Sequence, residues 1–159
     1  MYNSLIFKLI VSLILPLAIG ITAGVFTAQS VSEWYETLNK PSFNPPNWLF
    51  GPVWTFLYIL MGVSLFLVWK QEASTERNLA IFVFMIQLLL NFAWSFFFFH
   101  FHAIGLAFIE IIVLWISVVI LLVLFYNIKP MAAYINMPYF LWVTFAAVLN
   151  AAYYWLNRS

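Results

Sequence analysis

The chain contains no cysteine and very little charge. Only 7% of its 159 residues are Asp, Glu, Lys or Arg, whereas a soluble domain carries about 25%. The absence of cysteine excludes disulfides, thiolate nucleophiles and cysteine-ligated metals. A formal net charge of +1 gives no basic surface for binding nucleic acid, so we expect no nucleic-acid partner. With 66% hydrophobic residues, the composition is that of an integral membrane protein in a lipid bilayer.

Several apolar runs are long enough to cross a bilayer as helices, which takes about 20 residues each. The alternation of polar and apolar residues that is typical of a membrane β-barrel is not seen. We therefore predict an all-α integral membrane protein, a single domain of residues 1–159 with five transmembrane helices. The predicted spans are about 5–28, 47–69, 79–99, 104–126 and 134–156.

The longest connection, about residues 29–46, belongs to an aromatic and proline-rich segment. The stretch from Trp34 to Tyr58 reads WYETLNKPSFNPPNWLFGPVWTFLY and contains a single lysine, Lys40. Proline fixes its backbone φ angle, so the segment is stiff. It is either a rigid spacer at the membrane surface or a lid over a pocket between the helices.

An odd number of spans places the two chain ends on opposite sides of the membrane. We call the side that carries residues 29–46 the lid side and the other the N-terminal side. The N-terminal side carries more basic residues: Lys8, Lys70, Arg77 and Lys129, against Lys40 and Arg158. Because cytoplasmic loops are enriched in Lys and Arg, the N-terminus is expected to be cytoplasmic.

Polar and tryptophan side chains within the spans gather in the lid-side half of the membrane. A rise of 1.5 Å per helical residue places them there from four different spans. The half of the membrane on the N-terminal side is expected to be almost purely aliphatic and aromatic. A translocation path would continue polar groups across the whole membrane, so the distribution predicts a cavity open toward the lid side. The residues that define it are Trp54, Thr55, Tyr58, Asn91, Trp94, Ser95, Glu110 and Asn150.

Some of these residues have a structural explanation of equal standing. Gln87, Asn91 and Ser95 recur every four residues on one face of the third span, and hydrogen bonds between helices explain such a stripe. Glu110 is the only acid deep in a span, where apolar surroundings are expected to keep it neutral and able to donate a hydrogen bond. It is either a functional carboxyl or a structural partner of Asn150.

The expected cavity suits a flat and largely apolar ligand. Trp54 and Trp142 lie deeper than interfacial tryptophans do, which favours a role in a pocket wall. Indole and phenol rings hold such a ligand by stacking, and a few polar groups orient it. Lys40 is placed to meet an acidic substituent at the mouth. His100 and His102 flank a turn without convergent Cys or Asp, so we expect no metal site.

Several motifs follow one another along the chain: the Trp34–Tyr58 segment, QLLLNFAWSFFFF (87–99), Glu110 with Leu114-Trp115, and PYFLWVTFAAVLN (138–150). In order and spacing these motifs resemble the translocator protein family, also called TspO, tryptophan-rich sensory proteins or peripheral-type benzodiazepine receptors. The resemblance covers nearly the whole chain, and the short helix connections are similar to those of bacterial members.

The resemblance implies a five-helix protein, often a homodimer, with a pocket beneath the first loop and no required cofactor. Family members bind porphyrins, including protoporphyrin IX and haem, and ligands of the isoquinoline carboxamide or benzodiazepine type. Many relatives carry a basic or imidazole group where this chain has Asn47, which weakens the case for a propionate contact there. The expected ligand-binding residues are Trp34, Lys40 and Pro46 in the lid, and Trp54, Tyr58, Asn91, Trp94, Glu110, Trp142, Ala146 and Asn150 in the pocket.

The resemblance therefore implies a membrane receptor or sensor of porphyrin. Some bacterial relatives degrade porphyrin in light, and Trp54 and Trp142 are the candidate catalytic residues for such an activity, as electron donors. In the competing interpretation, the bound porphyrin bleaches itself. A transporter of porphyrin or other lipophilic molecules that uses Glu110 is the alternative function.

Overall fold

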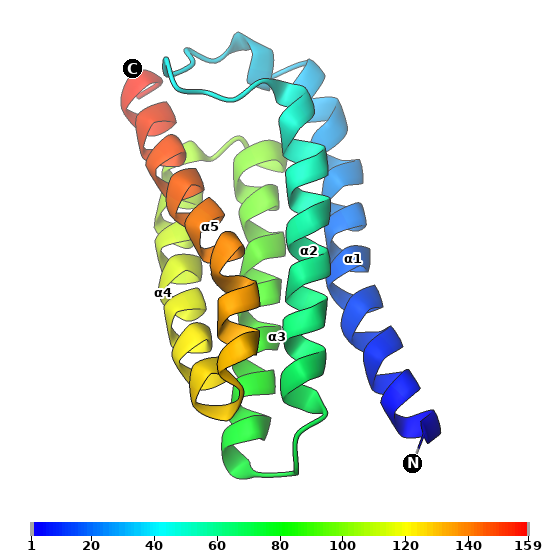
Figure 1. Cartoon of the computed structure of the whole chain (residues 1–159). Helices are drawn as coiled ribbons and strands as arrows, with labels where there is room; N and C mark the ends of the chain where they lie inside the picture. The colour runs from blue at the N-terminus through cyan, green and yellow to red at the C-terminus, as the bar shows by residue number, and fades with distance from the viewer. Residues whose placement is uncertain (1, 159) are drawn as a thin grey trace.

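The computed structural model describes residues 2–158, which contain helices and no strand. Each of the long helices is long and apolar enough to cross a membrane. The third span consists of α3 and the π-helical turn that follows it. The predicted five-helix membrane protein is thereby confirmed (Figure 1). The elements are α1 (Tyr2–Ser32), a 3-10 turn η1 (Tyr35–Thr37), α2 (Asn47–Trp69), α3 (Thr75–Ser95), a π-helical turn η2 (Phe96–His100), α4 (Ile104–Ile128) and α5 (Pro130–Leu156).

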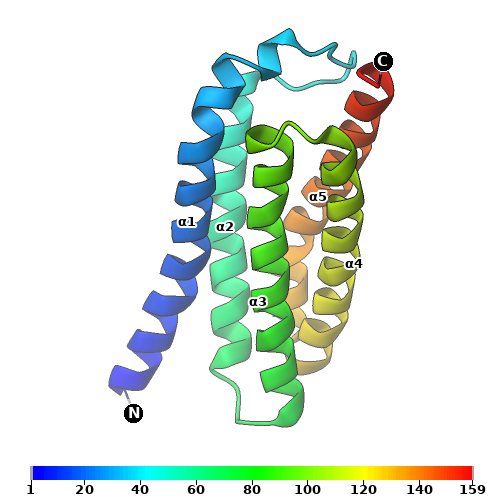
Figure 2. The same cartoon turned by 180° about the vertical axis from the view of Figure 1, so that it is seen from behind.

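The helices form a closed ring in the order α1, α2, α5, α4, α3. α1 completes the ring by contacting α2 on one side and α3 with η2 on the other. The N-terminal end of α1 leans away from the other helices, and the first loop caps the opposite end of the bundle (Figures 1 and 2). Large apolar side chains are exposed on the outer faces, as lipid contact requires, while rings such as Phe84, Phe125 and Tyr139 fill the interior.

Local sequence signals explain where several helices begin and end. α3 is capped by Ser74, whose hydroxyl accepts a hydrogen bond from the Arg77 backbone N–H at 3.1 Å. α5 starts with Pro130, which suits the first turn of a helix because it lacks an N–H. Only Lys129 separates α4 from α5, and α1 continues to Ser32, so the lid loop is 33–46 rather than 29–46.

Glycines allow α1 and α2 to pack closely in the middle of the membrane. A Cβ atom on Gly62 would lie 2.7 Å from the Ser12 carbonyl oxygen, and one on Gly20 would lie 2.3 Å from the Tyr58 ring. A Cβ atom on Gly24 would meet nothing within 4 Å. Gly20 and Gly24 form a GxxxG motif, which the sequence allows either as packing within the bundle or as a dimer face. Gly20 serves packing within the bundle, and a role of this motif in a homodimer stays a prediction.

A buried network of hydrogen bonds joins α2, α3 and α5. The Tyr58 hydroxyl donates to Asn91 Oδ1 at 2.6 Å, the Asn91 amide donates to the Tyr139 oxygen at 3.2 Å, and the Tyr139 hydroxyl donates to Gln87 Oε1 at 2.8 Å. The structural interpretation of Gln87 and Asn91 as residues that join helices is confirmed. The network also fixes the orientation of the Tyr58 ring.

The expectation that the half of the membrane on the N-terminal side is almost purely aliphatic and aromatic is wrong. Ser12, Ser64 and Asn136 are buried there. Ser64 donates to the Ala132 carbonyl oxygen at 3.0 Å and so bonds α2 to the backbone of α5. Small polar side chains are tolerated at such contacts because they let helices approach closely and can bond to a neighbouring backbone.

Candidate ligand-binding site

A cavity of about 390 Å³ lies in the lid-side half of the bundle. Its walls come from α1, α2, the end of α3 with η2, and the second half of α5, and Tyr35 of the first loop adds to them. Of the long helices, α4 alone contributes no lining residue among residues 2–158. The volume falls in the range of small-molecule pockets, roughly 300–1,000 Å³. The predicted cavity beneath the first loop is therefore present.

Aromatic rings form the main wall. Trp54 stacks on Tyr58 with ring centroids 5.5 Å apart, and it meets Trp142 nearly at a right angle, 88°, with centroids 6.5 Å apart. Phe50 lies edge-on against Trp142 at 6.1 Å. These contacts hold the rings at fixed angles, because the residues recur at helical spacing on the inner faces of α2 and α5. The wall therefore presents aromatic rings in fixed orientations to the cavity.

Most polar side chains of the lining already have hydrogen-bonding partners within the protein. The Trp94 indole N–H donates to Asn150 Oδ1 at 2.9 Å, and the Asn150 amide donates to the Ile104 carbonyl oxygen at 3.1 Å. The Tyr58 hydroxyl points to Asn91 behind the wall. The cavity therefore presents ring faces more than free hydrogen-bonding groups.

Many expected pocket residues line the cavity: Trp54, Tyr58, Trp94, Trp142, Ala146 and Asn150. Asn91 lies outside the lining, behind Tyr58. Other lining residues were not predicted from the sequence, among them Phe50, Phe145 and Tyr153. Helical spacing was the available signal, since Phe50 precedes Trp54 by four residues and Phe145, Leu149 and Tyr153 follow one another at the same interval.

Glu110 lies on α4, away from the cavity lining. Its side chain is 8% exposed, and neither carboxyl oxygen has a hydrogen-bonding partner among the described residues. The suggested structural partnership with Asn150 is absent, because Asn150 bonds to Trp94 and to the Ile104 carbonyl oxygen. The structure thus places Glu110 neither in the cavity lining nor in a hydrogen bond with Asn150, and a functional role of its carboxyl group stays a prediction.

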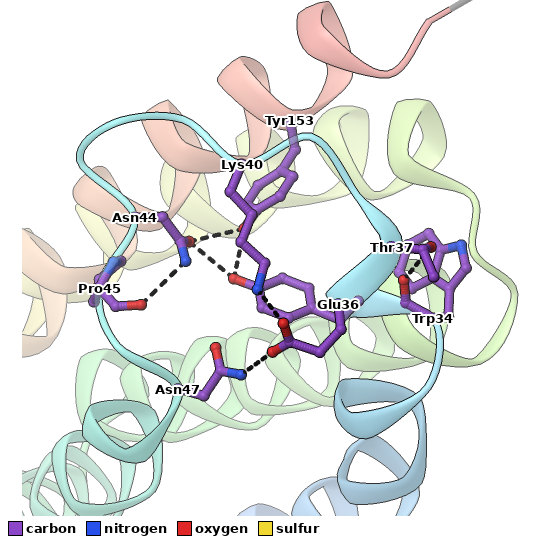
Figure 3. Close-up of polar contacts among 9 residues, drawn as sticks. Trp34, Glu36, Thr37, Lys40, Asn44, Pro45, Asn47 and Tyr153 are labelled. Atoms are coloured by element: carbon purple, nitrogen blue, oxygen red, sulfur yellow. Dashed lines mark hydrogen bonds and ion pairs between the residues drawn. The ribbon is translucent and has the colours of Figure 1, made fainter.

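The first loop is tied to the end of α5 by reciprocal hydrogen bonds. The Asn39 N–H donates to Asn157 Oδ1 at 2.9 Å, and the Asn157 amide donates back to the Asn39 carbonyl oxygen at 3.0 Å. Closer to the cavity, the Tyr35 hydroxyl donates to Asn44 Oδ1 at 2.9 Å, and the Tyr153 hydroxyl lies 2.7 Å from the Tyr35 oxygen (Figure 3). We call these contacts the α5 latch. They hold the loop over the end of the bundle.

The expected lid residues face other parts of the loop or its neighbours. The Lys40 ammonium lies 2.7 Å from Glu36 Oε2, and the Asn47 amide donates to the other Glu36 oxygen (Figure 3). Trp34 stacks on the His102 imidazole with centroids 4.1 Å apart, which attaches the loop to the turn after η2. Pro46 is exposed and directly precedes α2. Trp34, Lys40 and Pro46 all lie outside the cavity lining.

The contacts of Glu36 predict a pH dependence of the lid. Hydrogen bonds from Lys40 and Asn47 lower the pKa of Glu36 below its ordinary value of 4.5. A lowered folded-state pKa means that these bonds stabilise the fold fully above pH 4.5 and lose that effect as the pH falls through the folded pKa. The melting temperature of the wild type should therefore exceed that of Glu36→Gln at neutral pH, and the difference should shrink below pH 4.5. A difference that stays constant down to about pH 3 would contradict this assignment.

Comparisons with known proteins agree with this architecture. The model of the TspO/MBR family matches residues 12–156. The chain is 42% identical over 153 residues to the tryptophan-rich protein TspO of Archaeoglobus fulgidus, covering 96% of this chain and 98% of that protein. It is 40% identical over 159 residues to the tryptophan-rich protein TspO of Chlorobaculum tepidum (98% and 99% covered). It is 37% identical over 120 residues to the translocator protein of Homo sapiens (74% and 71% covered).

Proposed function

Since this chain belongs to the TspO/MBR family, we propose that it is a membrane receptor or sensor that binds a porphyrin, such as protoporphyrin IX or haem, in the cavity beneath the first loop. The observation that carries the proposal is the right-angled pair of Trp54 and Trp142 in the cavity wall. Isoquinoline carboxamide and benzodiazepine-type ligands would occupy the same site. We place the protein in a bacterial cell membrane with a cytoplasmic N-terminus, as a homodimer.

Stacking supports this ligand class better than hydrogen bonding does. The lining tryptophans offer ring faces, and the polar atoms of Trp94 and Asn150 are already paired. The acidic substituents of a porphyrin would remain at the lid side, where Asn47 belongs to the lining and Lys40 lies in the loop above. Turning Lys40 from Glu36 to a propionate costs little, because an exposed ion pair contributes little to stability.

A fluorescence titration tests the proposal. The chain has eight tryptophans, so binding of protoporphyrin IX in the cavity should quench their emission and saturate. Changing Trp54 and Trp142 to Phe should remove a large share of the quenching. Trp48→Phe is the control, because Trp48 is 71% exposed and outside the lining. Quenching that rises linearly without saturation would indicate a structural membrane protein with no porphyrin site.

The position of Trp54 and Trp142 also favours light-dependent porphyrin degradation as an accompanying activity. An excited porphyrin that takes one electron from an indole becomes a radical anion and leaves an indole radical cation. The reduced macrocycle then adds dissolved O2, and the oxygenated radical anion returns one electron to the indole radical cation. The net change is the addition of one O2 to the porphyrin, and the indole is restored. We predict that the double change to Phe retains binding, because a phenyl ring still stacks, but loses the protein-specific photoproduct. Chromatography of illuminated samples checks this. A product yield equal to that of free porphyrin in detergent would mean that the protein only holds the ligand.

Glu110→Gln separates the receptor proposal from transport. Because Glu110 lies outside the cavity lining, we expect this change to leave porphyrin affinity within about twofold of the wild type, less than the loss of a single net hydrogen bond would cause. Porphyrin uptake into sealed vesicles supplies the second measurement. Accumulation by the wild type that vanishes in Glu110→Gln would favour the transporter instead.

A further inference from the structure

The open side of the cavity lies between α1 and α2. Five lining residues are exposed, and all of them belong to these two helices: Ile21, Gly24, Asn47, Gly51 and Thr55. The lining residues of α3, η2 and α5 are buried or half-buried. A Cβ atom built on either Gly24 or Gly51 would meet nothing within 4 Å. The wall is thus missing on one side of the cavity.

The contacts of α1 explain this gap. α1 and α2 touch closely where Gly62 meets Ser12 and where Gly20 meets Tyr58. Beyond Gly20, α1 contacts η2, where the Phe26 and Phe96 ring centroids are 5.1 Å apart. The lid-side part of α1 therefore packs on η2.

The gap lies at the depth of lipid acyl chains. Gly24 precedes Ser32, the end of α1, by eight residues, which correspond to about 12 Å of helix. Thr55 follows Asn47, the start of α2, by the same number of residues and therefore by about the same length. With a hydrocarbon core about 30 Å thick, the opening faces the lid-side leaflet and not the aqueous phase alone.

The route from water through the first loop is closed by the α5 latch. Lifting the loop would break the reciprocal bonds of Asn39 with Asn157, and those among Tyr35, Asn44 and Tyr153, together. It would also unstack Trp34 from His102. The gap between α1 and α2 requires none of these contacts to break.

We propose that the gap between α1 and α2, bordered by Gly24, Gly51 and Thr55, is the portal through which a planar lipophilic ligand reaches the cavity from the lid-side leaflet. The proposal rests on the proposed porphyrin site. The glycines keep the portal open, because any larger side chain at these positions would stand in it. The latched loop then acts as a fixed roof.

Kinetics of protoporphyrin IX binding to the protein in lipid vesicles test the portal. Gly24→Trp places a bulky ring in the gap, and Val25→Trp is the matched control, because Val25 is 70% exposed and outside the lining. Obstructing a route without changing its end states slows both directions equally. We expect the association rate and the dissociation rate both to fall by about tenfold or more in Gly24→Trp, and neither rate to change in Val25→Trp. Unchanged rates, or a slower association with an unchanged or faster dissociation, would overturn the portal.

A crosslinked loop supplies the second arm. The chain has no native cysteine, so Asn39→Cys with Asn157→Cys introduces one disulfide across the α5 latch. We expect the oxidised form to bind porphyrin at a rate within about twofold of the wild type, as for a fixed roof. Binding by the oxidised form that is much slower than binding by the wild type, and that reduction restores, would show passage through the loop and overturn the portal. The proposed function itself fails if the wild type shows no saturable porphyrin binding. Either result that overturns the portal, from Gly24→Trp or from the crosslinked loop, leaves the porphyrin site in place.

Discussion

Changing Trp54 and Trp142 together to alanine is expected to weaken porphyrin binding by about 100- to 1,000-fold, since each buried aromatic anchor contributes about 2 kcal/mol. Both indoles line the cavity, and their ring centroids are 6.5 Å apart. Removing one leaves the other without its neighbour, so the two effects should not add fully. Each single change should therefore cost more than half of the binding free energy that the double change costs.

Titrations of porphyrin into Trp48→Ala and Trp115→Ala control for the loss of a tryptophan as such. Trp48 is exposed, and Trp115 on α4 donates a hydrogen bond to Thr144 outside the cavity lining. Both variants should bind porphyrin as the wild type does. A double alanine variant that keeps wild-type affinity, measured by the absorbance shift of the porphyrin, would place the ligand elsewhere on the protein.

Gly20→Ala is expected to destabilise the fold by about 1–3 kcal/mol, the usual cost of overpacking a core. The new methyl carbon would lie 2.3 Å from the Tyr58 ring. Tyr58 cannot turn aside freely, because its hydroxyl donates to Asn91 Oδ1 at 2.6 Å in the network that joins α2, α3 and α5. If the ring moves, that bond is lost and the cavity wall shifts with it, so porphyrin affinity should fall as well.

Gly24→Ala is the matched control, because a methyl group there meets nothing within 4 Å. Both variants exchange a helical glycine for alanine and gain the same helix propensity, about 1 kcal/mol. Thermal unfolding in lipid should show a lower transition temperature for Gly20→Ala than for Gly24→Ala. Equal transition temperatures would show that Tyr58 has room to move and that its bond to Asn91 does not fix it.

The helices could be predicted because their signal is local. Length and apolarity identify each span, and the depth of Trp54, Trp94 and Asn150 follows from counting residues along a helix. Depth placed these side chains in one half of the membrane, which is where the cavity lies. The same counting failed for Glu110, because depth does not give the direction in which a helical side chain points.

The remaining features depend on contacts between residues far apart in the chain. Asn39 and Asn157 are 118 residues apart, and neither carries a signal of its own that predicts the pairing. The sequence places Lys40 in the lid but does not show that its ammonium group pairs with Glu36. The gap between α1 and α2 depends on how α1 tilts toward η2, and tilt is set by packing rather than by apolar length.

The measurement that tests the central claim most directly is a structure of the protein in a lipid nanodisc with protoporphyrin IX bound. We predict density for the macrocycle inside the cavity, in contact with Trp54 and Trp142, with the Asn39–Asn157 bonds of the first loop still formed. Density on the outer, lipid-facing surface of the bundle, with the cavity unchanged and empty of porphyrin, would contradict the account.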